Sequence, residues 1–184
     1  MKRSLERRGH TVFLCSLSPL VIQDIRRLAR QLASNVARIR EKTGSDRVDL
    51  VGVSQGGLLS LWYLSQLNGA QYVQRCIAVG TPFQGSWAAA AGIPLIGAFS
   101  RGIWQVLPNS PVIRKLARTS VPKETTLITI AMTGDPLAPP DRCSIEGATH
   151  VVLDGPKTPF THQWMIFAPR TIDAIDAQLK REEA

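Results

Sequence analysis

One pentapeptide, Gly-Val-Ser-Gln-Gly at residues 52–56, constrains the fold of this chain more than any other feature. It lies at the end of the short, β-rich run Arg47–Val53, which has the composition of a buried parallel strand. It precedes the apolar segment Leu58–Leu67, which contains no helix breaker and stops at Asn68-Gly69. The sequence therefore predicts a strand, a tight glycine turn and a buried helix in immediate succession.

A serine in such a turn is typical of a nucleophile elbow. There the serine adopts a strained backbone conformation, and the neighbouring glycines avoid the collisions that Cβ atoms would cause. We therefore predict that Ser54 is a nucleophile and that Gly52, Gly56 and Gly57 support the turn. The alternative is a glycine-rich turn whose serine only caps the following helix.

An activated serine needs a base and an acid that orients the base, and in this arrangement the acid follows the serine and the histidine comes last. Asp135 follows the carboxyl end of the predicted strand Thr125–Thr133. Its carboxylate is therefore expected at the carboxyl edge of the sheet. Asp141 is the second choice for the acid. The alternative for Asp135 is a role limited to capping its own turn.

The base must be one of three histidines. His10 precedes the serine at the start of a predicted strand, and His150 begins the apolar run of the predicted strand Ala148–Leu153, so both are expected near the amino ends of strands. His162 lies in the loop after that last strand, where a base that serves Ser54 belongs. We therefore favour His162 over His150, and the remaining alternative is that neither is catalytic.

The rest of the chain alternates between strand-like and helix-like segments. We expect further strands at His10–Leu17 and Tyr72–Val79, and helices that end near Arg8, at Thr43-Gly44 and near Lys180. Strands that alternate with helices form a mostly parallel sheet with helices on both faces. A chain of 184 residues, of which 44% are hydrophobic, therefore predicts a single α/β domain over residues 1–184.

Residues 86–122 interrupt this alternation. They are rich in Ala, Gly, Pro and Ile and lie between two predicted sheet strands. An insertion at this place predicts a lid-like segment over an active site, and the alternative is a connecting pair of helices without a gating role. The long apolar stretch Trp87–Phe99 is interrupted by glycine and proline and is too short to span a bilayer, so no transmembrane segment is predicted.

Most of the net charge of +8 lies in the first 47 residues, which hold eleven Lys or Arg against four Asp or Glu. Within this region, apolar residues recur at helical spacing from Ile25 to Ile39, so the arginines occupy the outer face of a helix packed on a sheet. A surface for nucleic acid or anionic lipid is the alternative. Because no aromatic residues are interleaved and no nucleic-acid motif is present, we favour a solvated face without a nucleic-acid partner.

The three cysteines, Cys15, Cys76 and Cys143, are odd in number and far apart in or near apolar runs. This pattern favours buried thiols in a reducing compartment over disulfides or a metal site. The basic residues at the start are followed by only a brief, strand-like apolar run, so no secretory signal peptide is predicted and a cytoplasmic location is expected. The sequence contains no metal-ligand cluster and no phosphate-binding glycine loop, so we expect no cofactor.

Four segments, in the right order, resemble the bacterial class 2 triacylglycerol lipases, a branch of the α/β-hydrolase superfamily. They are the elbow region Thr43–Leu58, the segments Gly80–Gly85 and Asp135–Pro140, and the late segment His162–Pro169. The resemblance implies the α/β-hydrolase fold and hydrolysis of carboxylic esters. His162 would deprotonate Ser54, Asp135 would hold the imidazole, and water would release an acyl-enzyme.

The resemblance also implies that the main-chain N–H of Gln55 donates to an oxyanion. Where this chain has Val53 and Gln55, the family usually has His and Met. Related enzymes also have an additional strand at the start and a loop that supplies the second oxyanion N–H, so the fold is expected to be N-terminally shortened. Loss of one oxyanion donor typically lowers the rate by about 100- to 1000-fold. The sheet would also keep an exposed apolar edge, through which the chain could self-associate.

These patterns lead to two hypotheses for function. The first is a serine hydrolase that cleaves small-molecule or lipid esters through Ser54, Asp135 and His162. The second is a catalytically impaired hydrolase-fold module that binds an acyl ligand or a protein partner. Acyl transfer to an alcohol uses the same three residues as hydrolysis and differs only in how well water is excluded.

Overall fold

The computed structural model of the chain describes residues 1–17, 23–92, 94 and 100–181. The strands in these residues form one sheet in the order β1-β2-β3-β4, and every neighbouring pair is parallel. Their bounds are Val48–Val53 for β1, Val73–Val79 for β2, Thr126–Met132 for β3 and Thr149–Leu153 for β4. Because the strands are parallel, all four carboxyl ends lie at the same edge of the sheet.

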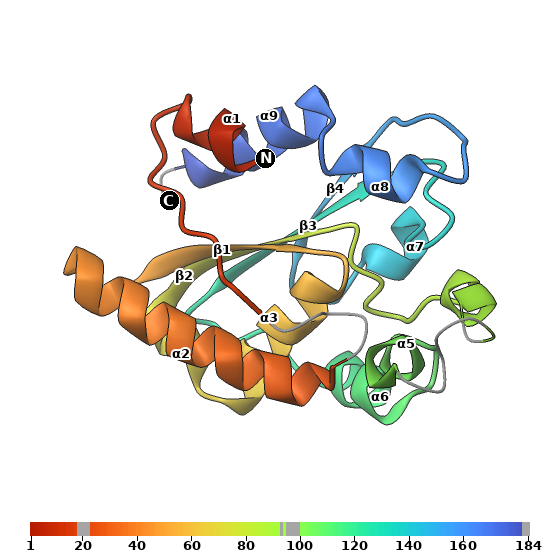
Figure 1. Cartoon of the computed structure of the whole chain (residues 1–184), viewed down its shortest axis with the longest axis horizontal. Coiled ribbons are helices and arrows are strands. Elements are labelled where there is room, and N and C mark those ends of the chain that lie inside the picture. The colour runs from red at the N-terminus through yellow and green to blue at the C-terminus, as the bar shows by residue number, and fades with distance from the viewer. Residues whose placement is uncertain (18–22, 93, 95–99, 182–184) are drawn as a thin grey trace.

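Helices cover both faces of the sheet (Figure 1). On one face lie α2 (Ile25–Thr43) and α3 (Gln55–Gln66), with α5 (Arg101–Gln105) and α6 (Pro111–Ala117) beside them. On the other face lie α1 (Lys2–Glu6) and α9 (Pro169–Leu179). The other short helices among the described residues are η1 (Gly69–Tyr72), η2 (Ala88–Gly92), α7 (Pro140–Cys143) and α8 (Thr161–Met165). This is the arrangement that the alternation of strands and helices predicts.

Two hydrophobic clusters hold the layers together, one on each face of the sheet. The first joins α2 and α3 to the strands and includes Leu28, Leu58 and Leu127. The second joins α1 and α9 to the strands and includes Leu5 and Ile175. In the described part of the chain, no helix combines the length and the apolar character needed to cross a membrane.

Capping residues fix both ends of α2. The Asp24 carboxylate accepts a hydrogen bond from the Arg26 N–H at 2.8 Å, and Gly44 ends the helix in the left-handed conformation with φ of 68°. Apolar residues from Ile25 to Val36 are buried along the inner side, whereas the arginines at positions 26, 27, 30 and 38 are exposed. The basic residues of α2 therefore lie on the outer face that their spacing predicts.

The predicted strand at His10–Leu17 is wrong, because residues 10–17 contain no strand. Val12 packs against the cluster on the α9 face, whereas Cys15 and Leu17 pack against the cluster on the α2 face. The segment therefore passes from one face of the sheet to the other (Figure 1). A segment on this path cannot run beside a strand and share ladder hydrogen bonds with it, so tertiary packing overrides its β propensity.

The inserted residues 86–122 contain η2, α5 and α6 in their described part. Val112, Ile113 and Leu116 of α6 belong to the same hydrophobic cluster as α2 and α3. Residues 93 and 95–99 of the insertion lie outside the described residues. The lid-like role of this segment stays a prediction, and α6 is part of the core.

The turn between β1 and α3 is tight and strained. Ser54 has φ of 53° and ψ of −121°, a conformation that a residue with a side chain rarely adopts. Its N–H donates to the Val79 carbonyl at 2.8 Å, and its own carbonyl accepts from Thr81 Oγ1 at 2.9 Å. Strand β2 and the loop after it therefore hold the strained residue in place.

Close packing explains two of the three glycines assigned to this turn. A Cβ atom on Gly52 would lie 2.7 Å from the main chain of Gly56, and one on Gly57 would lie 2.1 Å from Thr81 Oγ1. Gly56 differs from this expectation, because a Cβ atom there would meet nothing within 4 Å. Gly56 therefore contributes its main chain to the turn, and the missing side chain is not required for space.

The two adjacent glycines are expected to respond to alanine in opposite ways. Gly57→Ala should destabilise the fold by about 1–3 kcal/mol, because Thr81 is fully buried and bonded to Ser54, so it cannot move aside. Gly56→Ala should be neutral or should stabilise by up to about 1 kcal/mol, because alanine favours a helix more than glycine does. Urea unfolding of both variants measures the difference, and equal losses of stability would contradict this account of the turn.

Charged groups tie the amino-terminal segment to α9. The Asp176 carboxylate lies 2.7 Å from His10 Nε2, 3.0 Å from Lys180 Nζ and 3.4 Å from Arg8 Nη1. Arg8 also pairs with Asp173. The hydrogen bond from His10 is the main reason why the pKa of Asp176 lies below its ordinary value, and Lys180 and Arg8 lower this pKa further.

Asp176→Asn is expected to reduce the loss of stability in acid. A carboxyl whose pKa is lower in the folded chain than in the unfolded chain stabilises the fold above its unfolded pKa, and this contribution is lost as the pH falls through the folded pKa. Urea unfolding from neutral pH down to about pH 2 should therefore show a smaller decrease for the variant than for the wild type. Asp141→Asn removes a carboxylate whose side chain is 76% exposed and serves as the control. An unchanged acid dependence in Asp176→Asn would refute the role of this cluster.

Candidate active site

Three of the side chains predicted from the sequence form one hydrogen-bonded series. His162 Nε2 lies 2.9 Å from Ser54 Oγ, and His162 Nδ1 lies 2.7 Å from Asp135 Oδ2. Ser54 stands at the start of α3, Asp135 in the loop after β3, and His162 on α8, which follows β4. The carboxyl edge of the sheet therefore brings together residues that are 108 and 27 positions apart in the chain.

Main-chain N–H groups hold the Asp135 carboxylate in one orientation. Its Oδ1 accepts from the N–H of Leu137 at 2.8 Å and from the N–H of Ala138 at 3.0 Å. These bonds leave Oδ2 to His162, and the Asp135 side chain is 0% exposed. The turn-capping role considered for Asp135 is therefore present, but it uses only one of the two carboxylate oxygens.

The position of His162 depends on a glycine in the loop after β2. His162 is buried on α8, and Met165 of the same helix packs in the cluster on the α9 face. A Cβ atom on Gly80 would lie 2.7 Å from Met165 Sδ and 3.4 Å from His162 Cε1, and Gly80 has φ of 55°. Glycine at position 80 therefore allows the close approach of α8 to β2.

Gln55 contributes two groups with separate partners. Its main-chain N–H lies at the start of α3, where the helix dipole favours negative charge, and no hydrogen bond within the described residues uses this N–H. Its side chain is buried, and Nε2 donates to the carbonyl of Gly102 on α5 at 2.9 Å. The sequence does not predict this second contact. Its only signal in the sequence is the amide side chain at position 55, where the family usually has Met.

The other candidate residues lie outside this series. Asp141 Oδ2 lies 3.6 Å from Arg142 Nε. His150 Nδ1 lies 2.5 Å from Thr129 Oγ1 within the sheet, and His10 contacts Asp176 on α9. His10 and His150 therefore have other partners, and His162 is the histidine that lies beside Ser54.

Two thiols are kept from acting as nucleophiles. Burial, with a smaller contribution from the carboxylates of Asp135 and Asp141, raises the pKa of Cys143 to about 12. Burial likewise raises the pKa of Cys76 to about 12. Because the thiolate is the reactive form, neither cysteine competes with Ser54 at neutral pH.

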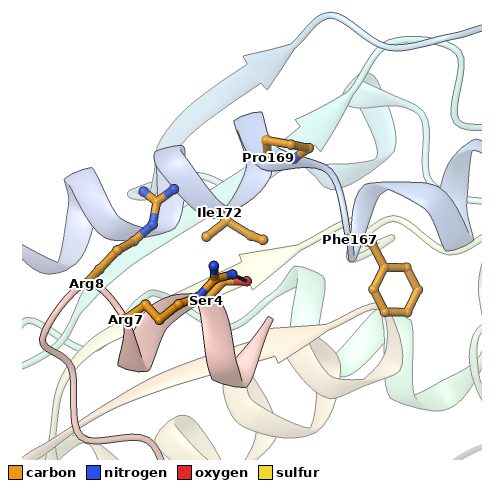
Figure 2. Close-up of a pocket in the computed structure, with 6 residues that line it drawn as sticks. All are labelled: Ser4, Arg7, Arg8, Phe167, Pro169 and Ile172. Carbon is orange, nitrogen blue, oxygen red and sulfur yellow. Dashed lines mark hydrogen bonds between the residues drawn. The ribbon is translucent and has the colours of Figure 1, made fainter.

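A second feature is a groove of about 430 Å³. It lies between the α1 segment and α9 (Figure 2). Its lining residues are Ser4, Arg7 and Arg8 on one side and Phe167, Pro169 and Ile172 on the other. Arg8 is paired with Asp173 and Asp176, and Arg7 donates to Ser4 Oγ. Because Ser54, Asp135 and His162 do not line this groove, it is separate from the candidate active site.

A family model described as alpha/beta hydrolase fold matches residues 24–95, a range that includes the elbow. A search of curated proteins finds no match for this chain. The family match ends before the loops that carry Asp135 and His162, so the geometry of these two residues comes from the structure alone.

Several solved structures resemble this fold at low sequence identity. The Bacillus licheniformis lipase BlEst2 in mature form has a TM-score of 0.62 and 18% identity, over 81% of this chain and 75% of that chain. Aspergillus fumigatus lipase B has a TM-score of 0.69 and 17% identity, over 89% of this chain and 44% of that chain. A metagenomic carboxyl esterase has a TM-score of 0.73 and 16% identity, over 96% of this chain and 67% of that chain. Together with the parallel sheet and the elbow between β1 and α3, these likenesses show that the chain has the α/β-hydrolase fold.

Proposed function

We propose that this chain is a serine hydrolase that cleaves carboxylic esters through Ser54. The observation that carries the proposal is the continuous series of hydrogen bonds from Ser54 through His162 to Asp135. A hydroxyl, an imidazole and a buried carboxylate in this order are the groups that nucleophilic acyl transfer requires. The strained backbone of Ser54 supports the proposal further, because strain of this kind concentrates at functional sites.

In the first half of the reaction, His162 Nε2 accepts the proton of Ser54 Oγ as this oxygen attacks the ester carbonyl carbon. The carbonyl π electrons move to the carbonyl oxygen, and the main-chain N–H of Gln55 donates to the resulting oxyanion. When the tetrahedral intermediate collapses, the alcohol leaves and takes the proton from His162. An acyl group then remains bonded to Ser54 Oγ.

In the second half, water takes the place of Ser54 as the nucleophile. His162 Nε2 accepts a proton from the water, and the hydroxide oxygen attacks the acyl carbon. The acid product leaves, and the proton returns to Ser54 Oγ. Throughout, Asp135 accepts the hydrogen bond from His162 Nδ1, which keeps Nε2 free to accept a proton and stabilises the imidazolium.

Exposed aromatic residues lie close to His162 in the sequence, a composition that suits an apolar ester as the substrate. Phe160 is 72% exposed and Trp164 is 42% exposed, one on each side of His162 in the chain. Exposed aromatic side chains offer apolar contact area to an acyl or alcohol group. Both lipid esters and small-molecule esters have such groups, and the similar structures named above are lipases and a carboxyl esterase.

Ser54 is expected to react with a fluorophosphonate probe, which phosphonylates activated serines, to give one adduct per chain. Ser54→Ala should remove the adduct, and intact mass spectrometry measures both results. Ser60→Ala, which changes a buried serine on the same helix, is the matched control and should keep the adduct. If a wild-type chain shown to be folded by circular dichroism takes no label, the hydrolase proposal fails. That result would favour a hydrolase-fold module that binds an acyl ligand or a protein partner.

Asp135→Asn is expected to lower kcat/KM for a p-nitrophenyl ester by about 10³- to 10⁴-fold. The asparagine keeps an oxygen for the N–H groups of Leu137 and Ala138 but turns an amide N–H towards His162 Nδ1. The imidazole must then carry its proton on Nε2, where it can no longer accept the Ser54 proton. Asp141→Asn is the control and should change kcat/KM by less than about two-fold, because Asp141 is an exposed surface carboxylate. Equal losses in both variants would argue against a specific role for Asp135.

A further inference from the structure

Helix α5 is bonded to the residue that directly follows the nucleophile. Gln55 is only 8% exposed, and its side-chain Nε2 donates to the Gly102 carbonyl in a buried hydrogen bond of 2.9 Å. This bond joins the first turn of α3 to α5 across 47 positions of the chain. Buried amides are seldom left without partners, so the contact links the two helices specifically.

Further hydrogen bonds fix the two ends of α5. Ser100 Oγ accepts from the Ile103 N–H at 3.1 Å at the start of the helix. Gln105 Oε1 accepts from the N–H of Ile25, the first residue of α2, at 2.7 Å. Because α5 has only five residues, it is not stable by itself, and these contacts with the rest of the fold determine its position.

We propose that Gln55 is a positioning residue whose side-chain amide holds α5 as a fixed wall of the substrate site beside the oxyanion. This inference rests on the proposed function, in which the N–H of Gln55 donates to the oxyanion. Gln55 supplies both the main-chain N–H for the oxyanion and the side-chain amide that binds α5. The distance from α5 to the expected substrate carbonyl is therefore about the length of one side chain. Residues 101–105 therefore act as a fixed connecting helix and not as the moving part of a lid.

The inference predicts an effect on substrate binding that is larger than the effect on the chemical step. Without the amide donor, α5 moves more freely, and the acyl or alcohol group loses a firm contact surface. The series Ser54, His162 and Asp135 and the main-chain N–H of residue 55 stay in place. Such a change removes binding that the ground state and the transition state share, which raises KM more than it lowers kcat.

Gln55→Met tests this inference, because methionine has nearly the length of glutamine and lacks the N–H donor. Gln66→Met is the matched control, because Gln66 lies at the other end of α3 and, among the described residues, its Nε2 donates only to the adjacent Ser65 Oγ. Hydrogen exchange of the amides of Ile103 in α5 and of Val106, which caps the helix, measures how firmly the helix is held. Steady-state kinetics with p-nitrophenyl butyrate measures KM and kcat separately.

In Gln55→Met, exchange of the α5 amides should become about five-fold faster, the change expected from loss of one net hydrogen bond. Exchange in β2 and β3 should not change, and KM should rise by a larger factor than kcat falls. Gln66→Met should match the wild type in both measurements. Unchanged exchange in α5, or a kcat that falls more than KM rises, would overturn the inference. If the wild type takes fluorophosphonate label while these changes are absent, only the role of Gln55 fails; if the wild type takes no label, the proposed function fails as well.

Discussion

The strained turn at Ser54 is the constraint on which the rest of the site depends. A non-glycine residue with φ of 53° and ψ of −121° costs about 1–3 kcal/mol, so its surroundings must hold it. Here the Val79 carbonyl binds the Ser54 N–H and Thr81 Oγ1 binds the Ser54 carbonyl, so β2 and its loop oppose relaxation. If the main chain relaxed, Ser54 Oγ would leave its position 2.9 Å from His162. The reactivity proposed for the hydroxyl therefore depends on the contacts that β2 and the loop after it make with the turn.

Successive loops at the carboxyl edge pack on one another because glycine occupies the contact points. A Cβ atom on Gly80 would meet Met165 on α8, and one on Gly134 would lie 2.6 Å from the carbonyl of Pro156 in the loop after β4. Each glycine lets the loop of one strand approach the segment that carries His162. Parallel strands bring these segments to one edge, and the small residues let them come within hydrogen-bonding distance.

The features that the sequence predicts correctly are those set by neighbouring residues. The end of α2 at Gly44, the elbow at Ser54 and the strands that follow each have a local pattern of spacing or turn residues. The segment His10–Leu17 has a strand-like pattern, but its path depends on two clusters formed by distant parts of the chain. The bond from Gln55 to α5 could not be predicted, because its acceptor is a main-chain carbonyl and any residue has one.

The bonds of the Asp135 carboxylate determine when this group becomes oriented. Its two oxygens are chemically distinct, since Oδ1 binds two main-chain N–H groups and Oδ2 binds His162. A half-turn of the carboxylate that exchanged the oxygens would break all three bonds in a place without water, since the side chain is 0% exposed. The entropy of orienting this group is therefore lost when the chain folds and not when a substrate arrives. If a positive charge develops on the imidazole, the carboxylate that stabilises it is already oriented. Little energy is then needed to reorganise the surroundings.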